Sequence, residues 1–231
     1  MTRSALLVRH GQHERNDRVA ELLRGRGFRL DQRFVARGDE LPALDEGHDL
    51  CVVYGGPQMA SEAEQIDYLA AELRWIDDWV GAGRPYLGIC LGAQMLARSQ
   101  GAKVEAHRAG LHEVGYAEVL PTPRGREVLP EPMYAYHWHS EGFDVPAGAE
   151  LLAVGRVFEN QAFRLDGRIY GLQFHPEVTR EMMQEWMTEA SHCLLRPGAQ
   201  SREQQIAGAE RYHEPLGAWL EGFLDRWIEG R

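Results

Sequence analysis

The sequence predicts an α/β protein with a mainly parallel sheet and helices on both of its faces. Two short runs, residues 50–54 and 86–89, are almost entirely apolar, as expected of strands buried on both faces. Segments with helical spacing of apolar residues separate such runs, which is the alternation of a parallel α/β fold. After Gly101, short β-like runs broken by Pro and Gly predict a more antiparallel second half with hairpins.

The first half of the chain alternates strands and helices in order. Residues 5–8 suit a buried first strand, and residues 28–35 predict a second. Between them, Asn16 is placed to cap a helix that Gly25 and Gly27 end. A longer amphipathic helix is predicted after residues 50–54 from apolar side chains at helical spacing: Ile66, Leu69, Ala70, Leu73, Ile76 and Val80.

The second half contains five β-like runs: 114–120, 133–138, 151–154, 162–165 and 169–174. Asp166-Gly167 is a hairpin signal between the last two. Thr179 is placed to cap a helix that extends to Leu194. Residues 204–228 predict a final helix, which Pro215 should kink or interrupt.

Length and composition limit the class of protein. A chain of 231 residues without a linker or repeat suits one domain over 1–231, with a helical extension over about 198–231. The 25 Lys and Arg against 35 Asp and Glu give a net charge of −10, which argues against nucleic acid or an anionic membrane as partner. Three cysteines without a pairing pattern, and an N-terminal apolar run too short for a signal peptide, predict a cytoplasmic protein.

The stretch most suggestive of chemistry surrounds Cys90. A strand over 86–89 passes at once into a helical pattern, and Gly88 and Gly92 stand two residues on either side of Cys90. This is the pattern of a nucleophile elbow, in which glycines permit close backbone contacts and the apical side chain points outward. A helix N-terminus also favours a thiolate. The alternative is a buried structural cysteine.

A cysteine nucleophile needs a base and a group that orients the base. His175 follows an apolar strand, where active sites of open α/β sheets lie, and Glu177 can hold its imidazole. Gly55-Gly56-Pro57 also follows a strand, and its backbone N–H groups can serve an oxyanion hole or form a plain turn. These residues favour acyl transfer at the strand ends.

Two other interpretations compete. His137 and His139 share one face of a strand and suggest a metal site, but we expect none because no acidic or cysteine ligand stands at a suitable spacing. The Leu7-Val8-Arg9-His10-Gly11 stretch, with Asn16 beyond, looks like a histidine phosphatase signature. That chemistry needs further arginines and a second histidine in matching surroundings, which are not evident.

Three motifs together resemble the class I glutamine amidotransferases: GICLGAQ at 88–94, FHPE at 174–177 and GGP at 55–57. They occur in the family's order, and the similarity extends roughly to the helix after Glu177. Glu113-Val114-Gly115 and His139-Ser140-Glu141 look most like the free-standing proteins that resemble the glutaminase domain of GMP synthase. The resemblance implies a doubly wound, flavodoxin-like fold.

The resemblance also implies roles for individual residues. Cys90 is implied to attack the side-chain amide of glutamine, with His175 passing the proton to ammonia and Glu177 orienting His175. Further implied roles are the oxyanion hole for the backbone N–H groups of Gly56 and Leu91, and substrate binding for Gln94 and for the backbone around His139 and Ser140. No cofactor is implied, and Cys51 and Cys193 are expected to be structural.

The resemblance leaves the acceptor of ammonia open. No synthetase domain or nucleotide site is visible, so the expected function is a glutaminase that supplies ammonia to a partner, with feeble activity alone. The loop over 57–64 is polar and small, and its expected mobility supports such gating. The alternatives are a self-sufficient γ-glutamyl amide or peptide hydrolase and an inactive binding module. Oligomeric state is left open.

Overall fold

The computed structural model describes residues 3–11 and 16–230, so the outermost residues of the expected domain lie outside it. The strands of the described chain are β1 Ser4–Arg9, β2 Arg29–Phe34, β3 Leu50–Val53, β4 Tyr86–Ile89, β5 Val104–Ala106, β6 Glu113–Pro121, β7 Met133–His139, β8 Glu141–Phe143, β9 Glu150–Val154, β10 Asn160–Arg164 and β11 Ile169–Leu172. The α-helices are α1 Arg18–Gly25, α2 Asp67–Gly81, α3 Leu91–Ser99, α4 Arg180–Glu189 and α5 Arg202–Glu229. Single 3-10 turns are η1 Val35–Arg37, η2 Ala60–Gln65, η3 Gly125–Glu127 and η4 Ser191–Leu195.

One large sheet organises the fold, with strand order β2-β1-β3-β4-β11-β10-β9-β6-β7. Strands β2, β1, β3, β4 and β11 are parallel to one another, and the pairs from β11 to β7 are antiparallel. A small separate sheet pairs β5 with β8. The predicted α/β class, with a mainly parallel first half and antiparallel strands in the second, is therefore confirmed.

Strand β11 departs from the predicted division into two halves. It forms the expected hairpin with β10, but its other edge pairs in parallel with β4, with Gly171 opposite Gly88. The hairpin reverses the chain, and a fully buried apolar strand is best accommodated in the middle of the sheet. As a result, the segment after β11 leaves the sheet beside the segment after β4.

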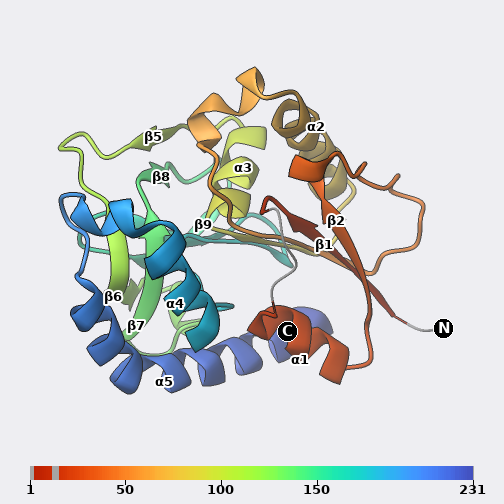
Figure 1. The fold of residues 1–231 in the computed structure, drawn as a ribbon. Helices are drawn as coiled ribbons and strands as arrows, with labels where there is room; N and C mark the ends of the chain where they lie inside the picture. The colour runs from red at the N-terminus through yellow and green to blue at the C-terminus, as the bar shows by residue number, and fades with distance from the viewer. Residues whose placement is uncertain (1–2, 12–15, 231) are drawn as a thin grey trace.

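Helices cover both faces of the sheet, as predicted. Figure 1 shows α2 and α3 above the sheet and α1 and α5 below it. Side chains alternate between two cores: Leu6 and Val8 of β1 face the core that contains α2 and α3, whereas Leu7 faces the core that contains α1, α4 and α5. Burial on both faces explains why the central parallel strands β3, β4 and β11 consist of apolar residues.

The C-terminal helix α5 is part of the second of these cores. A capping box between Ser201 and Gln204 begins it, and it continues through Pro215, so of the two predicted effects, a kink or an interruption, the interruption does not occur. A proline inside a helix costs about 3 kcal/mol. Buried side chains on both sides of it, including Ala209 and Leu220, offset this cost by anchoring both halves of the helix.

Two other helix ends differ from their predicted positions. Asp17, not Asn16, caps α1, because its carboxylate accepts the N–H of Ala20 while Asn16 bonds to Glu21. Thr179 caps α4 as predicted, but α4 ends at Glu189 and the chain continues as the 3-10 turn η4. Both differences concern local capping, which leaves the layers of the fold unchanged.

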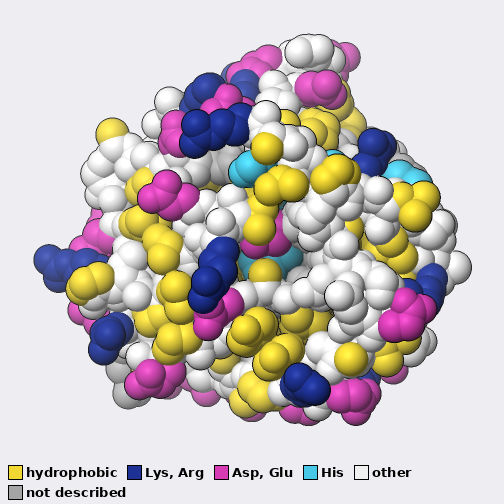
Figure 2. All heavy atoms as spheres, turned by 90° about the vertical axis from the view of Figure 1, so that its left-hand side faces the viewer, with side chains coloured by type: hydrophobic (Ala, Val, Ile, Leu, Met, Phe, Trp, Pro, Cys, Tyr) yellow, Lys and Arg dark blue, Asp and Glu magenta, His cyan; other side chains and the backbone are white. Residues whose placement is uncertain are grey.

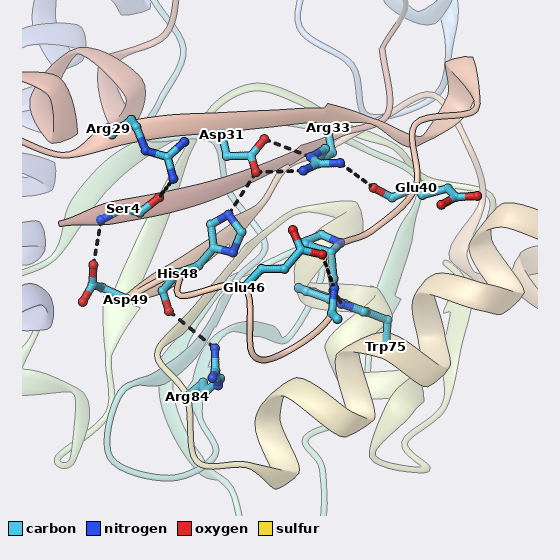
Figure 3. A network of polar contacts seen from close by, with 12 residues as sticks. Ser4, Arg29, Asp31, Arg33, Glu40, Glu46, His48, Asp49, Trp75 and Arg84 are labelled. Carbon is cyan, nitrogen blue, oxygen red and sulfur yellow. Dashed lines mark hydrogen bonds and ion pairs between the residues drawn. The ribbon is translucent and has the colours of Figure 1, made fainter. Parts of the chain in front are cut away.

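The edge strand β2 is polar, unlike the central strands. In Figure 3, the carboxylate of Asp31 accepts hydrogen bonds from Arg33 at 2.9 and 3.0 Å and contacts His48 at 3.0 Å. The backbone N–H of Ser4 donates to Asp49 at 2.6 Å in the same region. Charges along an edge strand discourage pairing with another chain. This edge of the sheet is therefore closed off, several strands away from β11 in the strand order.

Candidate active site

Four parallel strands bring their carboxyl ends to one edge of the sheet. Segments that follow β1, β3, β4 and β11 there supply His10, Gly55, Cys90 and His175, and all four residues line one cavity of about 330 Å³. This edge lies to the left in Figure 1 and faces the viewer in Figure 2, which shows a hollow bordered by hydrophobic side chains. The carboxyl edge of an open α/β sheet is where ligands bind.

Cys90 has the geometry of the predicted elbow. Its φ of 51° is the only positive φ of a non-glycine residue in the described chain. A Cβ at Gly88 would collide with the backbone of Gly92, and one at Gly92 would collide with the carbonyl of Val53. Both glycines are therefore required sterically, and the strained cysteine is held at the N-terminus of α3.

His175 and Glu177 form a buried pair next to this cysteine. The Nδ1 atom of His175 lies 2.8 Å from Oε1 of Glu177, and both side chains are almost completely buried. Burial alone would lower the pKa of His175, but the charges of Glu177 and Cys90 raise it to about 10. Among the described residues, its buried Nε2 atom has no hydrogen-bond partner apart from the interaction of the imidazole with the Cys90 side chain. The imidazole is thus oriented by the carboxylate and adjacent to the thiol, and both neighbours favour its charged form.

Glycines position the segment after β3 against these groups. A Cβ at Gly55 would lie 2.8 Å from Cε1 of His175 and 3.4 Å from Cβ of Cys90, so only glycine fits there. A Cβ at Gly56 would collide with the side chain of His10. Leu91 is the first residue of α3, so its N–H has no acceptor within the helix. The structure thus places Gly56 beside the cavity and Leu91 directly after the cysteine.

The predicted substrate-binding residues gather around a different feature, the turn between β7 and β8. The Nε2 of Gln94 donates to the carbonyl of Glu141 at 2.9 Å, and Nδ1 of His139 lies 2.9 Å from the same oxygen. Ser140 is in the turn itself. None of the three predicted residues lines the cavity. They therefore adjoin each other and this turn, and lie outside the cavity that contains Cys90 and His175.

The two histidines that suggested a metal site, His137 and His139, have an acidic neighbour after all. The register of β6 and β7 places Glu113 opposite His139. Its Oε2 lies 3.0 Å from Nε2 of His139 and 3.3 Å from Nδ1 of His137. Burial would raise the pKa of Glu113, but the two histidines and Gln161 lower it to about 2. The expectation that these histidines have no acidic neighbour was wrong. The register of β6 and β7, and not spacing along the sequence, places Glu113 beside them.

The N-terminal motif does not have the geometry of a phosphatase site. The Nε2 of His10 contacts both carboxylate oxygens of Glu72, at 3.1 and 2.9 Å, deep inside the protein. Arg9 forms a 2.6 Å ion pair with Asp17. A ring nitrogen that is already bound to a carboxylate is not placed to receive a phosphoryl group.

The remaining cysteines differ from Cys90 in their surroundings. Cys51 is completely buried in β3, and this burial raises its pKa well above its ordinary value. Cys193 is half-buried in η4, where its sulfur lies 3.5 Å from Nε2 of His192. Neither lines the cavity.

The sequence analysis missed the apolar wall of the cavity. Trp138 of β7 and Trp186 and Met182 of α4 line it together with Tyr54. Trp186 packs edge-on against the ring of His175, with centroids 4.9 Å apart. A helix was predicted over these residues of α4, but the spacing of its apolar side chains does not separate those that face the cavity from those that face the core. In the described residues, no helix is both long and apolar enough to span a membrane.

Comparison with known proteins agrees with this geometry. The family model described as glutamine amidotransferase class-I matches residues 20–194. The glutamine amidotransferase-like protein YfeJ of Salmonella typhimurium is 30% identical over 170 residues, which cover 69% of this chain and 69% of YfeJ. A second relative is one subunit of the glutamine-hydrolysing GMP synthase of Ignicoccus hospitalis. It is 31% identical over 157 residues, which cover 65% of this chain and 78% of that protein.

A solved structure agrees over the entire fold. The crystal structure of a glutamine amidotransferase from Thermotoga maritima has a TM-score of 0.87 and 28% sequence identity, and the alignment covers 99% of both chains. Residues 20–194 of the family match contain the carboxyl ends of β3, β4 and β11, with the elbow and the histidine–glutamate pair, whereas β1 lies before them. The chain belongs to the class I glutamine amidotransferase family, whose enzymes use a cysteine nucleophile.

Proposed function

We propose that this chain hydrolyses the side-chain amide of glutamine through a thioester on Cys90. The proposal rests on one observation: the carboxyl ends of β4 and β11 lie side by side. The elbow after β4 presents a strained cysteine, and the segment after β11 presents His175, held by Glu177 at 2.8 Å. A nucleophile, a base and an orienting group in contact are what acyl transfer requires.

The proposed reaction has two halves. The Cys90 thiolate attacks the amide carbon, and the N–H groups of Gly56 and Leu91 stabilise the oxyanion. The C–N bond then breaks, and ammonia leaves with a proton from His175. In the second half, water that has lost a proton to His175 attacks the thioester, which releases glutamate and restores the thiol. Glu177 keeps the imidazole oriented throughout.

Recognition of the glutamyl group is proposed for the turn between β7 and β8. Backbone atoms of His139 and Ser140 would hold the α-amino and carboxylate groups. Gln94 supports this assignment because its side chain already fixes the carbonyl of Glu141, the first residue of β8 after that turn. Glu141 also holds the segment that follows Gly56, because its carboxylate accepts the backbone N–H of Ser61 at 3.1 Å.

Replacing the nucleophile tests the catalytic assignment. Cys90→Ser should abolish glutamine hydrolysis and covalent labelling by 6-diazo-5-oxo-L-norleucine, because a serine hydroxyl is not ionised near neutral pH. The control is Cys51→Ala combined with Cys193→Ala, which should fold and retain both activities. Intact mass after labelling and steady-state ammonia release are the measurements. Hydrolysis by Cys90→Ser at the wild-type rate would exclude the assignment, and absence of labelling in the wild type would favour a binding module.

We further propose that a partner enzyme accepts the ammonia. The support is the similarity to one subunit of a glutamine-hydrolysing GMP synthase. The loop that was expected to gate activity gives this idea less support, because Ala60 and Ala63 anchor it in the core. Glutamine hydrolysis by the isolated chain should nevertheless be slow. A kcat for glutamine within the ordinary range of about 1–10³ s⁻¹ without a partner would contradict this dependence.

One observation favours the second candidate, a self-sufficient hydrolase of γ-glutamyl amides. The cavity beside Cys90 is formed in the chain alone, and its apolar wall is already assembled from α4 and β7. A site that served only to release ammonia to a partner would need no such wall.

A further inference from the structure

The cavity beside the cysteine is larger than an ammonia leaving group requires. It has a volume of about 330 Å³. One water molecule, close to ammonia in size, occupies about 30 Å³ in the liquid. Pockets for small organic ligands begin at roughly 300 Å³. The space next to the reacting sulfur is therefore sufficient for an organic group.

The walls of the cavity are aromatic and have unused hydrogen-bond donors. Trp138 and Trp186 meet edge to face with centroids 5.9 Å apart, and both are half-buried. The other four tryptophans donate their indole N–H to backbone carbonyls. Neither cavity tryptophan does so within the part of the chain described here. These two rings thus pack as walls of an open space, with stacking surface available to a ligand.

The position of the cavity identifies which half of a substrate it would hold. It contains Cys90, His175 and Gly56, but none of the residues proposed to hold the glutamyl group. An amide that spans the nucleophile places its acyl half at the glutamyl-binding turn. Its nitrogen substituent is then left to the remaining space around His175, which must deliver a proton to that nitrogen. The cavity is therefore placed for the amine half.

The charges around the cavity limit the chemistry of that amine. In the described ranges, each cation of the lining is already paired with a carboxylate: Arg9 with Asp17 at 2.6 Å, His10 with Glu72 at 2.9 Å and His175 with Glu177 at 2.8 Å. A carboxylate on the amine would lose its hydration without gaining an unpaired cation among them. The lining therefore favours an amine without a carboxylate.

We propose that the cavity is a subsite for the amine half of γ-glutamyl amides of apolar, preferably aromatic, amines. This substrate class rests on the proposed function, since the same Cys90 thioester forms. The amide C–N bond breaks, the amine leaves with the proton from His175, and water then releases glutamate from the sulfur. Glutamine remains a substrate whose small leaving group leaves the subsite empty.

Matched substrates test the subsite. The first pair is γ-glutamylbenzylamide and γ-glutamylmethylamide, which differ only in the phenyl ring. Burial of a ring of this size should raise kcat/KM about tenfold to a hundredfold for the benzylamide. The second pair is γ-glutamylphenethylamide and γ-glutamylphenylalanine, which differ only in the carboxylate. The acid should be the poorer substrate by about tenfold or more.

Substitution of a cavity tryptophan tests whether the aromatic wall causes the preference for the benzylamide. Trp186→Ala should bring the benzyl-to-methyl ratio of kcat/KM close to one, and Trp138→Leu should lower it if the first variant does not fold. Because the ratio is taken within one variant, any general loss of turnover cancels. Trp75→Ala, a tryptophan of α2 away from the cavity, should leave the ratio unchanged. An unchanged ratio in folded Trp186→Ala would exclude this wall as the subsite.

Measurements of substrate binding test the subsite even if hydrolysis by the isolated chain requires a partner. In Cys90→Ala, calorimetry should give a Kd for the benzylamide about tenfold or more below that for the methylamide. Equal Kd values would overturn the subsite, and would leave the proposed function intact if the wild type still reacts with diazo-norleucine. Absence of both labelling and hydrolysis of any γ-glutamyl amide would instead remove the proposed function itself.

Discussion

Two histidine–carboxylate pairs lie at the same edge of the sheet. They differ in which group lies next to the second ring nitrogen of the histidine. His175 contacts Glu177, two residues along the chain, at 2.8 Å, and His10 contacts Glu72, far away in sequence on α2, at 2.9 Å. Both imidazoles are buried, and both line the cavity. Only His175 has Cys90 beside its remaining nitrogen. The His10 ring instead lies behind Gly56.

The comparison shows that a buried pair is not by itself a catalytic base. A carboxylate fixes the ring and favours its charged form in both places. Catalysis needs, in addition, a second nitrogen that reaches the reacting atom. We therefore propose proton transfer for His175, and for His10 the structural role of supporting the glycine segment that faces the cysteine.

The largest expected effect separates the two histidines by activity. His175→Asn should reduce kcat/KM for γ-glutamyl amides by about 10²–10⁴-fold, the usual contribution of a general acid–base group. His10→Asn should reduce it far less, because His10 does not reach the sulfur. Steady-state kinetics on both purified variants is the measurement. Equal losses in folded variants would show that the two pairs are not functionally distinct.

The second effect is on stability. Removing His10 leaves the fully buried Glu72 without its partner, and breaking a buried pair in this way costs about 3–5 kcal/mol. Glu72→Gln keeps a hydrogen-bonding group of the same shape opposite the ring and should cost less. Urea unfolding followed by fluorescence measures both free energies. A His10→Asn variant as stable as the wild type would refute the structural role.

The third effect is the dependence of stability on pH. Both histidines have folded-state pKa values above the unfolded value of about 6.5, and that of His175 is about 10. Their stabilisation is therefore present in full below about pH 6.5 and is lost as pH rises towards 10. The free energy of unfolding should fall between pH 7 and 10, with a shallower slope in His175→Asn. Parallel slopes would contradict the raised pKa of His175.

The smallest effect concerns a third contact of this kind, Glu113 with His137 and His139. These atoms satisfy one another at 3.0–3.4 Å, and Gln161 donates a further hydrogen bond to the carboxylate at 2.9 Å. We expect dialysis against a chelator to change neither hydrolysis nor the unfolding midpoint. Metal content before and after dialysis is the accompanying measurement. A bound equivalent of zinc whose removal lowers either quantity would make this cluster a metal site.

The prediction from sequence succeeded where chemistry and neighbours are local in the chain. The apolar runs correctly predicted the central parallel strands, because burial on both faces leaves no place for polar side chains. The glycines around Cys90 gave the elbow, because only they permit its close backbone contacts. The cap predicted at Asn16 lies at Asp17, and the interruption that was one alternative for Pro215 does not occur, since tertiary contacts chose between neighbouring caps and offset the helix-breaking effect of proline.

What the sequence alone determined is thus the fold class, the elbow at Cys90 and the short-range pair of His175 with Glu177. Only the tertiary structure decided that β11 lies against β4, which brings the thiol and the imidazole together. It also brought Glu72 to His10, Glu113 to His139 and Trp138 to Trp186. The physical reason is that hydrophobic periodicity indicates which face of a helix or strand is buried. Strand order and register determine which residues pack against that face.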